Sequence, residues 1–282
     1  VVVPADFIGT HRWLDLGASP YPYRTHRSHD GRASSGLLPS PTLWSIHTAR
    51  GVYNRTRLSE WIDATPSKSR VLTLTTSPAW AAKYQDYGSP IRWPNQPHSH
   101  DPYGDPQDLA DLIDWIYTPT ISGGAGFSAA DIPYLEMRNE PSFGFYGSSW
   151  SDPSTTNRWP DANNQLRLSD EAGGNLGPFY NGSAVDLKNE TQAVFNSKPS
   201  GVKLIGNAWE LATEGDGSTR FGQPNAFRNA GGMAFLDGFS YHTYMYSNDP
   251  DKVGRIGRNV RAWLDSIGYA SLPMYNTEAG HE

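Results

Sequence analysis

The chain of 282 residues contains no cysteine. This absence excludes disulfide bonds, thiolate nucleophiles and thiolate metal sites, so the fold must depend on packing alone. No apolar run approaches the roughly 18 residues that a membrane-spanning helix needs. The 23 basic and 29 acidic side chains give a net charge of -6 and form no block of one sign. Nucleic acid and membrane lipid are therefore not expected partners.

Several catalytic and targeting signals are also missing. The sequence has no Gly-x-Ser-x-Gly elbow, no phosphate-binding Gly-Lys-Ser/Thr and no His-Glu-x-x-His. His98-Ser99-His100-Asp101 lies in a Pro-rich loop, without the helical spacing that fixes metal ligands. We therefore expect no metal, no cofactor and no obligate protein partner. The opening Val1–Pro4 segment lacks the basic flank and apolar length of a signal peptide. We expect a secreted or periplasmic protein, and if it is exported its signal has already been removed.

Aromatic residues and loop formers, by contrast, are plentiful. The chain has 10 Trp, 15 Tyr and 10 Phe among 28 Gly and 22 Pro. Flat rings suit stacking on sugar faces, although ordinary packing is the alternative for each single ring. Trp80 and Trp209 follow predicted strands and are equally compatible with sugar stacking and with packing.

Short β-branched runs alternate with segments of helical period, the pattern of a parallel sheet wound with helices. The helix that begins at Asp105-Pro106 is the clearest, because a capping residue precedes proline at the first helical position. Further helices are predicted at Leu58–Ala64, Val185–Phe195 and Val253–Ile267. The predicted strands are Phe7–Trp13, Tyr23–His29, Val71–Thr76, Pro133–Arg138, Val202–Gly206, Phe239–Tyr244 and Met274–Thr277.

This order predicts an α/β fold of the (β/α)8 barrel type, formed by residues 1–282 as a single catalytic domain. Four long polar stretches interrupt the alternation, and three of them follow predicted strands or their extensions. In a barrel such loops build the C-terminal face, where active sites lie. They are Gly31–Pro41, Ser89–Gly104, Gly144–Asn175 and Asn207–Gln223.

Two predicted strands each deliver a glutamate at their end. The run Ile132–Pro141 ends in Asn139-Glu140-Pro141, and Leu272–Gly280 carries Thr277-Glu278-Ala279-Gly280. Glycosidic bonds are cleaved by two carboxyl groups, one donating a proton to the leaving oxygen and the other attacking the anomeric carbon or activating water. A separation of about 5 Å implies retention of configuration, and one of roughly 6.5–9.5 Å implies inversion.

These two motifs resemble the signatures of the large retaining glycosidase clan A. Other segments are similar to glycoside hydrolase family 39 and its bacterial exopolysaccharide-hydrolase relatives, in the same order over nearly the whole chain. They are Arg24–Asp30, Trp44–Ile46, Ala49–Asn54, Ser77–Ala81 and Asp237–Tyr244.

The resemblance implies that Glu140 is the general acid/base, Glu278 the nucleophile and Asn139 a ligand of the sugar 2-hydroxyl. It also places His242 and Tyr244 in the site from the sixth strand. For these roles the pocket should raise the pKa of Glu140, whereas a nearby cation and hydrogen bonds should keep Glu278 ionised.

For the cation we expect Arg27, with Tyr244 as the hydrogen-bonding partner of Glu278. His29, on the same early strand as Arg27, either reaches the cleft or is a core histidine. Arg138 stands where the clan often has Trp, which predicts an unusual subsite wall. No eighth strand and helix are predicted before Glu282.

The function predicted from the sequence is therefore hydrolysis of β-linked oligo- or polysaccharide by double displacement. Two alternatives stay open: a carbohydrate-binding barrel that has lost catalysis, and another clan A enzyme such as an endo-glucanase or mannanase. The sugar itself is not readable, because specificity depends on loop shape.

Overall fold

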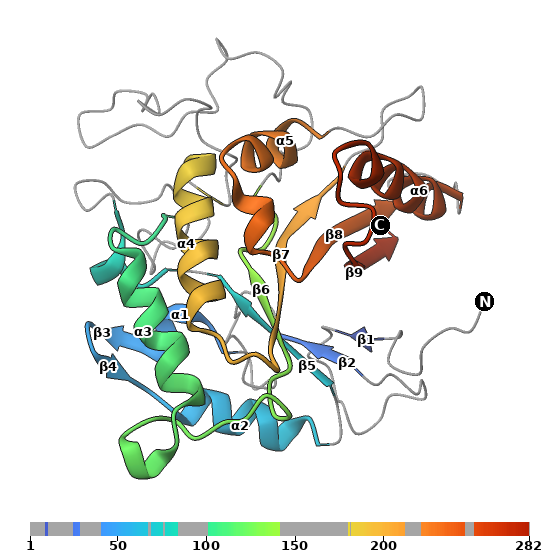
Figure 1. The fold of residues 1–282 in the computed structure, drawn as a ribbon. Helices are drawn as coiled ribbons and strands as arrows, with labels where there is room; N and C mark the ends of the chain where they lie inside the picture. Colours follow the sequence, from blue (N-terminus) through green and yellow to red (C-terminus); the bar gives the residue numbers. More distant parts are fainter. Residues whose placement is uncertain are drawn as a thin grey trace.

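A parallel sheet of seven strands forms the centre of the molecule (Figure 1). The computed structural model describes residues 9–10, 25–28, 41–66, 69–75, 77–83, 101–141, 180, 182–211, 221–245 and 251–281. All six neighbouring strand pairs are parallel. The strands in sheet order are β1 (Gly9–Thr10), β2 (Thr25–Arg27), β5 (Ser69–Leu74), β6 (Tyr134–Met137), β7 (Lys203–Glu210), β8 (Gly238–Met245) and β9 (Met274–His281).

Helices connect most of these strands and lie on the outer side of the curled sheet (Figure 1). The helices are α1 (Leu43–Ile46), α2 (Thr56–Ala64), α3 (Pro106–Tyr117), α4 (Ala184–Ser197), α5 (Gly222–Asn229) and α6 (Asp251–Ser266). Shorter 3-10 turns are η1 (Ala79–Ala81), η2 (Thr120–Ser122) and η3 (Gly232–Phe235), and a hairpin joins β3 (His47–Ala49) to β4 (Val52–Tyr53).

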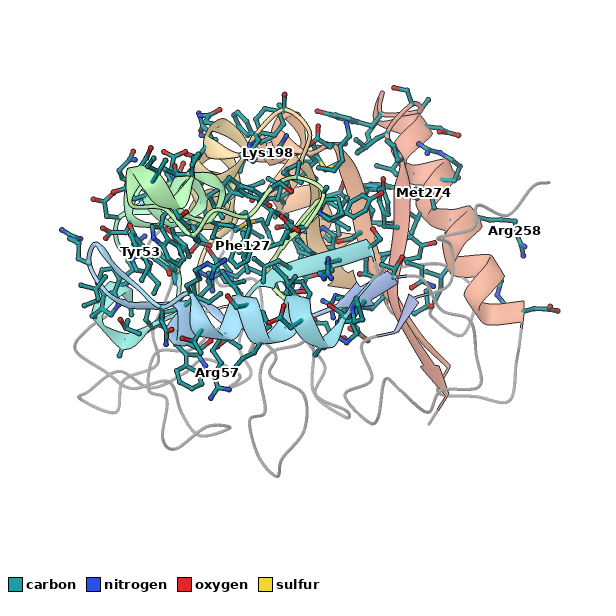
Figure 2. The ribbon with its side chains drawn as sticks, turned by 90° about the horizontal axis from the view of Figure 1, so that it is seen from below. Tyr53, Arg57, Phe127, Lys198, Arg258 and Met274 are labelled. Atoms are coloured by element: carbon teal, nitrogen blue, oxygen red, sulfur yellow. The ribbon has the colours of Figure 1, made fainter. Side chains whose placement is uncertain are left out.

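The helix boundaries follow from local sequence. Asp105 caps α3 by accepting a hydrogen bond of 3.0 Å from the Gln107 amide, and Pro106 fills the first helical position. Ser183 and Asp186 form a capping box at the start of α4. One face of α3 is fully buried through Leu109, Leu112, Ile113 and Ile116. Figure 2 shows the side chains between sheet and helices, with Met274 of β9 beside α6, which carries Arg258.

The curl of the sheet gives it an inner and an outer face. The rings of Tyr134 on β6 and Tyr275 on β9 lie 5.9 Å apart, although two other strands separate β6 from β9. Rings that far apart in the sheet meet only if they point to the inside of the curl. On the outer face, Phe239 of β8 contacts Trp263 of α6 at 5.4 Å between ring centroids. The alternation of side chains along each strand therefore separates barrel interior from helix layer.

The predicted fold class is confirmed: a curled parallel sheet alternates with helices, as in a (β/α)8 barrel that is incomplete. All seven predicted strands and all four predicted helices are present in the expected order. The sequence missed α1, the β3–β4 hairpin and α5, and β7 continues to Glu210 through a stretch predicted as loop. The sheet described ends at β1 and β9, and no eighth strand belongs to it. No described helix is long and apolar enough to cross a membrane.

Candidate active site

The end of strand β6 carries Glu140 in an unusual backbone conformation. Arg138 and Glu140 have positive φ angles of 39° and 45°, which non-glycine residues seldom adopt. Main-chain bonds hold this turn to both neighbouring strands, because the Arg138 amide donates to the Leu74 carbonyl and the Glu140 amide donates to the Ala208 carbonyl, each at 3.1 Å. The strand end is thus fixed from two sides, and strain of this kind is concentrated at functional sites.

The Glu140 carboxyl contacts a histidine from the strand two places along the sheet. Nδ1 of His242, on β8, lies 2.8 Å from Oε1 of Glu140. The His242 side chain is fully buried, and Glu140 is 7% exposed. A hydrogen bond between two such buried groups fixes the direction of the carboxyl group at the mouth of the sheet.

Strand β9 brings Glu278 to the same place. In the register of β8 with β9, Tyr241 pairs with Asn276 and His242 pairs with Glu278. Thr277 is therefore the extra residue of a bulge, a device that redirects side chains at strand ends. The backbone of Glu278 thus lies beside the histidine that contacts Glu140, while its side chain is not among the described ones.

A buried ion pair lies on the inner face below this point. Arg27 on β2 donates from Nε to Glu136 Oε2 at 2.5 Å and from Nη2 to Asn139 Oδ1 at 2.7 Å. Glu136 also accepts hydrogen bonds from Thr277 at 2.7 Å and Thr73 at 3.2 Å. Burial alone would raise the pKa of Glu136, but the charges of Arg27 and His242 and the Thr277 bond hold this pKa below its ordinary value.

This network links four strands of the sheet to the candidate site. Arg27 reaches Asn139, the residue expected to hold the sugar 2-hydroxyl, and Thr277 immediately precedes Glu278. Glu136 therefore serves as a structural ion-pair partner that joins both glutamate-bearing strand ends.

Arg138 corrects one expectation. The sequence predicted that it would alter a subsite wall, but its side chain points to the helix layer. Arg138 pairs with Glu190 of α4, and the Tyr180 hydroxyl donates to the same carboxylate at 2.8 Å. Arg138 follows Met137 on β6 with a left-handed backbone, which accounts for its outward direction.

For Trp209 the sequence left sugar stacking and packing equally open. Its side chain is fully buried, and its ring packs at 5.9 Å from the Phe227 ring of α5. The packing alternative therefore holds, and Trp209 belongs to the core. Trp80 is half-buried, donates to the His47 carbonyl at 3.0 Å and meets the His47 ring edge-on. A stacking role for Trp80 stays a prediction.

Other predicted site residues fall outside what the structure describes. His29 lies outside the described residues, as do most of the four polar stretches. Tyr244 lies on β8, but its side chain is not among the described ones. The described side chains include no group of three or more His, Asp or Glu that could hold a metal ion.

Sequence reasoning missed Asn207, on β7. It has a φ angle of 56°, is fully buried, and neither atom of its side-chain amide has a hydrogen-bond partner within the described structure. The available signal was an asparagine inside the apolar run Leu204–Trp209, because asparagine is depleted in strands.

Comparison with solved structures supports the fold. A glucosidase from Croceicoccus marinus superposes with a TM-score of 0.55 at 14% identity, over 92% of this chain and 46% of its own. The catalytic domain of GH30 xylanase C from Talaromyces cellulolyticus gives 0.38 at 13% identity, over 84% and 49%. An endo-β1,6-glucanase gives 0.42 at 13% identity, over 91% and 48%.

The chain thus spans about half the length of the solved structures it matches. The xylanase and the endo-glucanase have TM-scores below 0.5, so the similarity to the glucosidase alone supports the barrel-like fold. No protein-family model matches the chain, and no curated protein is significantly similar to it in sequence.

Proposed function

We propose that the protein is a retaining glycoside hydrolase, with Glu140 as general acid/base and Glu278 as nucleophile. The observation that carries the proposal is the meeting of two strand ends at one histidine. His242 contacts the Glu140 carboxyl at 2.8 Å, and the backbone partner of His242 on β9 is Glu278. Two carboxyl groups delivered from the carboxyl ends of parallel strands to one point are what glycoside cleavage requires.

The reaction proceeds in two displacements. Glu140 donates its proton to the glycosidic oxygen while the Glu278 carboxylate attacks the anomeric carbon, so the bond to the leaving sugar breaks as a glycosyl ester forms. Glu140, now ionised, then removes a proton from water, and the resulting attack at the anomeric carbon releases Glu278. Each step inverts the anomeric carbon, and the product keeps the original configuration.

The neighbouring residues orient the substrate and the carboxyl groups. Asn139 is held by Arg27 through its side-chain oxygen, which leaves the amide NH2 group to donate to the sugar 2-hydroxyl. His242 fixes the rotamer of Glu140, and Tyr244 supports Glu278 from β8. Arg27 pairs its charge with Glu136 and donates a hydrogen bond to Asn139, so it supports the site from below.

The proposed substrate is a β-linked oligo- or polysaccharide outside the cytoplasm. The carbohydrate class rests on the fold, which resembles that of a glucosidase, and on the aromatic content of the chain. The β-linkage and the secreted or periplasmic location are proposed from the family resemblance.

The proposal is tested with aryl β-glycosides and a panel of polysaccharides. We expect the wild type to release phenol or reducing sugars, and Glu278→Ala to lower kcat by about 10³-fold or more while retaining the wild-type circular dichroism spectrum. No turnover by either protein would instead favour a carbohydrate-binding barrel, and equal turnover by both would exclude Glu278 as the nucleophile.

Azide assigns the two roles in the same experiment. Glu278→Ala should be rescued by azide to give the α-glycosyl azide, because azide then attacks from the face that Glu278 occupied. Glu140→Ala should give the β-glycosyl azide, and it should retain activity best on substrates with acidic phenol leaving groups, which need no proton. The opposite pair of products would exchange the two roles.

A further inference from the structure

Strand β7 contains a bulge next to the candidate acid. Gly206 pairs with Phe239 of β8 and Trp209 pairs with Tyr241, so Asn207 and Ala208 together oppose the single residue Ser240. Ser240 holds the bulge through its hydroxyl, which donates to the Gly206 carbonyl at 2.6 Å and accepts from the Ala208 amide at 2.8 Å. The Ala208 carbonyl in turn accepts a hydrogen bond from the Glu140 amide at 3.1 Å, so the bulge is bonded directly to the end of β6 that carries Glu140.

The two residues of the bulge face the interior of the curled sheet. A Cβ at Gly206 would meet Leu236 in the helix layer, and the Trp209 ring packs on Phe227 of α5. Gly206 and Trp209 therefore both point outward. The two residues between them share the other side, as expected where two residues oppose one in a bulge. Asn207 thus lies on the interior face, on the strand between those of Glu140 and His242.

This arrangement is costly in the free protein. Asn207 and Ala208 have φ angles of 56° and 27°. Each of these strained residues lowers the stability of the folded protein unless other contacts offset the strain. The Asn207 amide is fully buried, and neither its oxygen nor its nitrogen has a hydrogen-bond partner among the described residues. A buried amide with neither bond made is rare and calls for a specific explanation.

We propose that Asn207 is a sugar-binding residue whose side-chain amide binds a sugar hydroxyl other than the one at C2. This inference rests on the proposed function. A hydroxyl both donates and accepts, so one hydroxyl, or two neighbouring ones, can satisfy the amide oxygen and nitrogen together. The hydroxyl at C2 is excluded because Asn139 is the residue expected to bind it. Ala208, which follows Asn207 in the chain, accepts the hydrogen bond from the Glu140 amide. The same bulge therefore orients both the acid Glu140 and the sugar bound by Asn207.

The test compares two glycine variants of the bulge. Asn207→Gly removes the amide and relieves the left-handed backbone, whereas Ala208→Gly relieves the same kind of backbone strain and removes no polar group. Each of the two variants should raise the Tm by about 2–4 °C. For Asn207→Gly we expect kcat/KM to fall about 10- to 100-fold on the aryl β-glycoside that the wild type cleaves best.

Substrates that lack one hydroxyl give the decisive readout. The 3-, 4- and 6-deoxy forms of that glycoside are measured with wild type and both variants. One deoxy form should lose at least about tenfold in kcat/KM with the wild type and with Ala208→Gly, but nothing further with Asn207→Gly, because the contact has already gone.

The inference is overturned if every deoxy form loses the same factor with Asn207→Gly as with the wild type. It is also overturned if Asn207→Gly lowers the Tm and leaves kcat/KM unchanged, which would assign a structural role. If the wild type cleaves no glycoside, both the proposed function and this inference are refuted. If the wild type is active and either result above is found, only the inference about Asn207 is refuted.

Discussion

A buried arginine–glutamate ion pair lies on each side of strand β6. On the inner face Glu136 pairs with Arg27 of β2, and just beyond the strand Arg138 turns outward to pair with Glu190 of α4. All four side chains are less than 5% exposed. The partners of each pair differ: the inner one bonds to Asn139 and Thr277, and the outer one to Tyr180 and the Tyr103 amide.

The difference separates two uses of the same chemistry. The outer pair fastens the end of β6 to the helix layer, and both tyrosines there have a pKa well above the usual range, chiefly because of burial. The inner pair joins residues that flank the two candidate catalytic glutamates. A buried ion pair is weak evidence for stability by itself, so its neighbours decide what it does. Breaking the outer pair should therefore affect folding most, and altering the inner pair should affect the site.

The largest expected effect is the loss of the outer arginine. Arg138→Met leaves the Glu190 carboxylate buried without its cation, which should lower the free energy of unfolding by about 3–5 kcal/mol in urea titrations. The matched control is Arg50→Met, which breaks the pair with Asp108. Because the Arg50 side chain is 69% exposed, that loss should be about 0–1 kcal/mol. Equal losses in the two variants would show that burial of the outer pair does not matter.

A smaller effect, in the acid range, is expected at the inner pair. The folded-state pKa of Glu136 lies below its ordinary value of 4.5, so the folded protein binds this proton less readily than the unfolded chain. Its contribution to stability is therefore present above pH 4.5 and is lost as pH falls through the folded pKa.

Urea titrations at a series of pH values measure this contribution. The difference in unfolding free energy between the wild type and Glu136→Gln should shrink as pH falls below 4.5. Glu60→Gln, at an exposed surface pair with Arg57, is the control and should differ little from the wild type throughout. A difference for Glu136→Gln that is constant with pH would contradict the depressed pKa.

Much of the fold could be predicted from the sequence, because its signals are local. The alternation of apolar runs located all seven strands, and Asp105-Pro106 located the start of α3. The strand-end position of Glu140 was readable for the same reason, since the run Pro133–Arg138 leads directly into it.

The rest depends on contacts between distant segments. The asparagine at position 207 is the local signal in β7, but the bulge itself depends on Ser240, 33 residues later, which holds it by hydrogen bonds. The outward direction of Arg138 likewise depends on Glu190 in a helix that follows much later, and the burial of Trp209 depends on Phe227 of α5. Alternation along a single strand fails at each of these places, because a bulge or a left-handed residue changes which side faces inward.

The most direct test of the account is the configuration of the first product. Proton NMR can follow the wild type as it cleaves a β-glycoside, before the released sugar mutarotates. If Glu140 and Glu278 act together across one linkage, the β-anomer should appear first and the α-anomer should grow in only by mutarotation. An α-anomer formed first would mean direct attack by water, and it would contradict the proposed double displacement through Glu278.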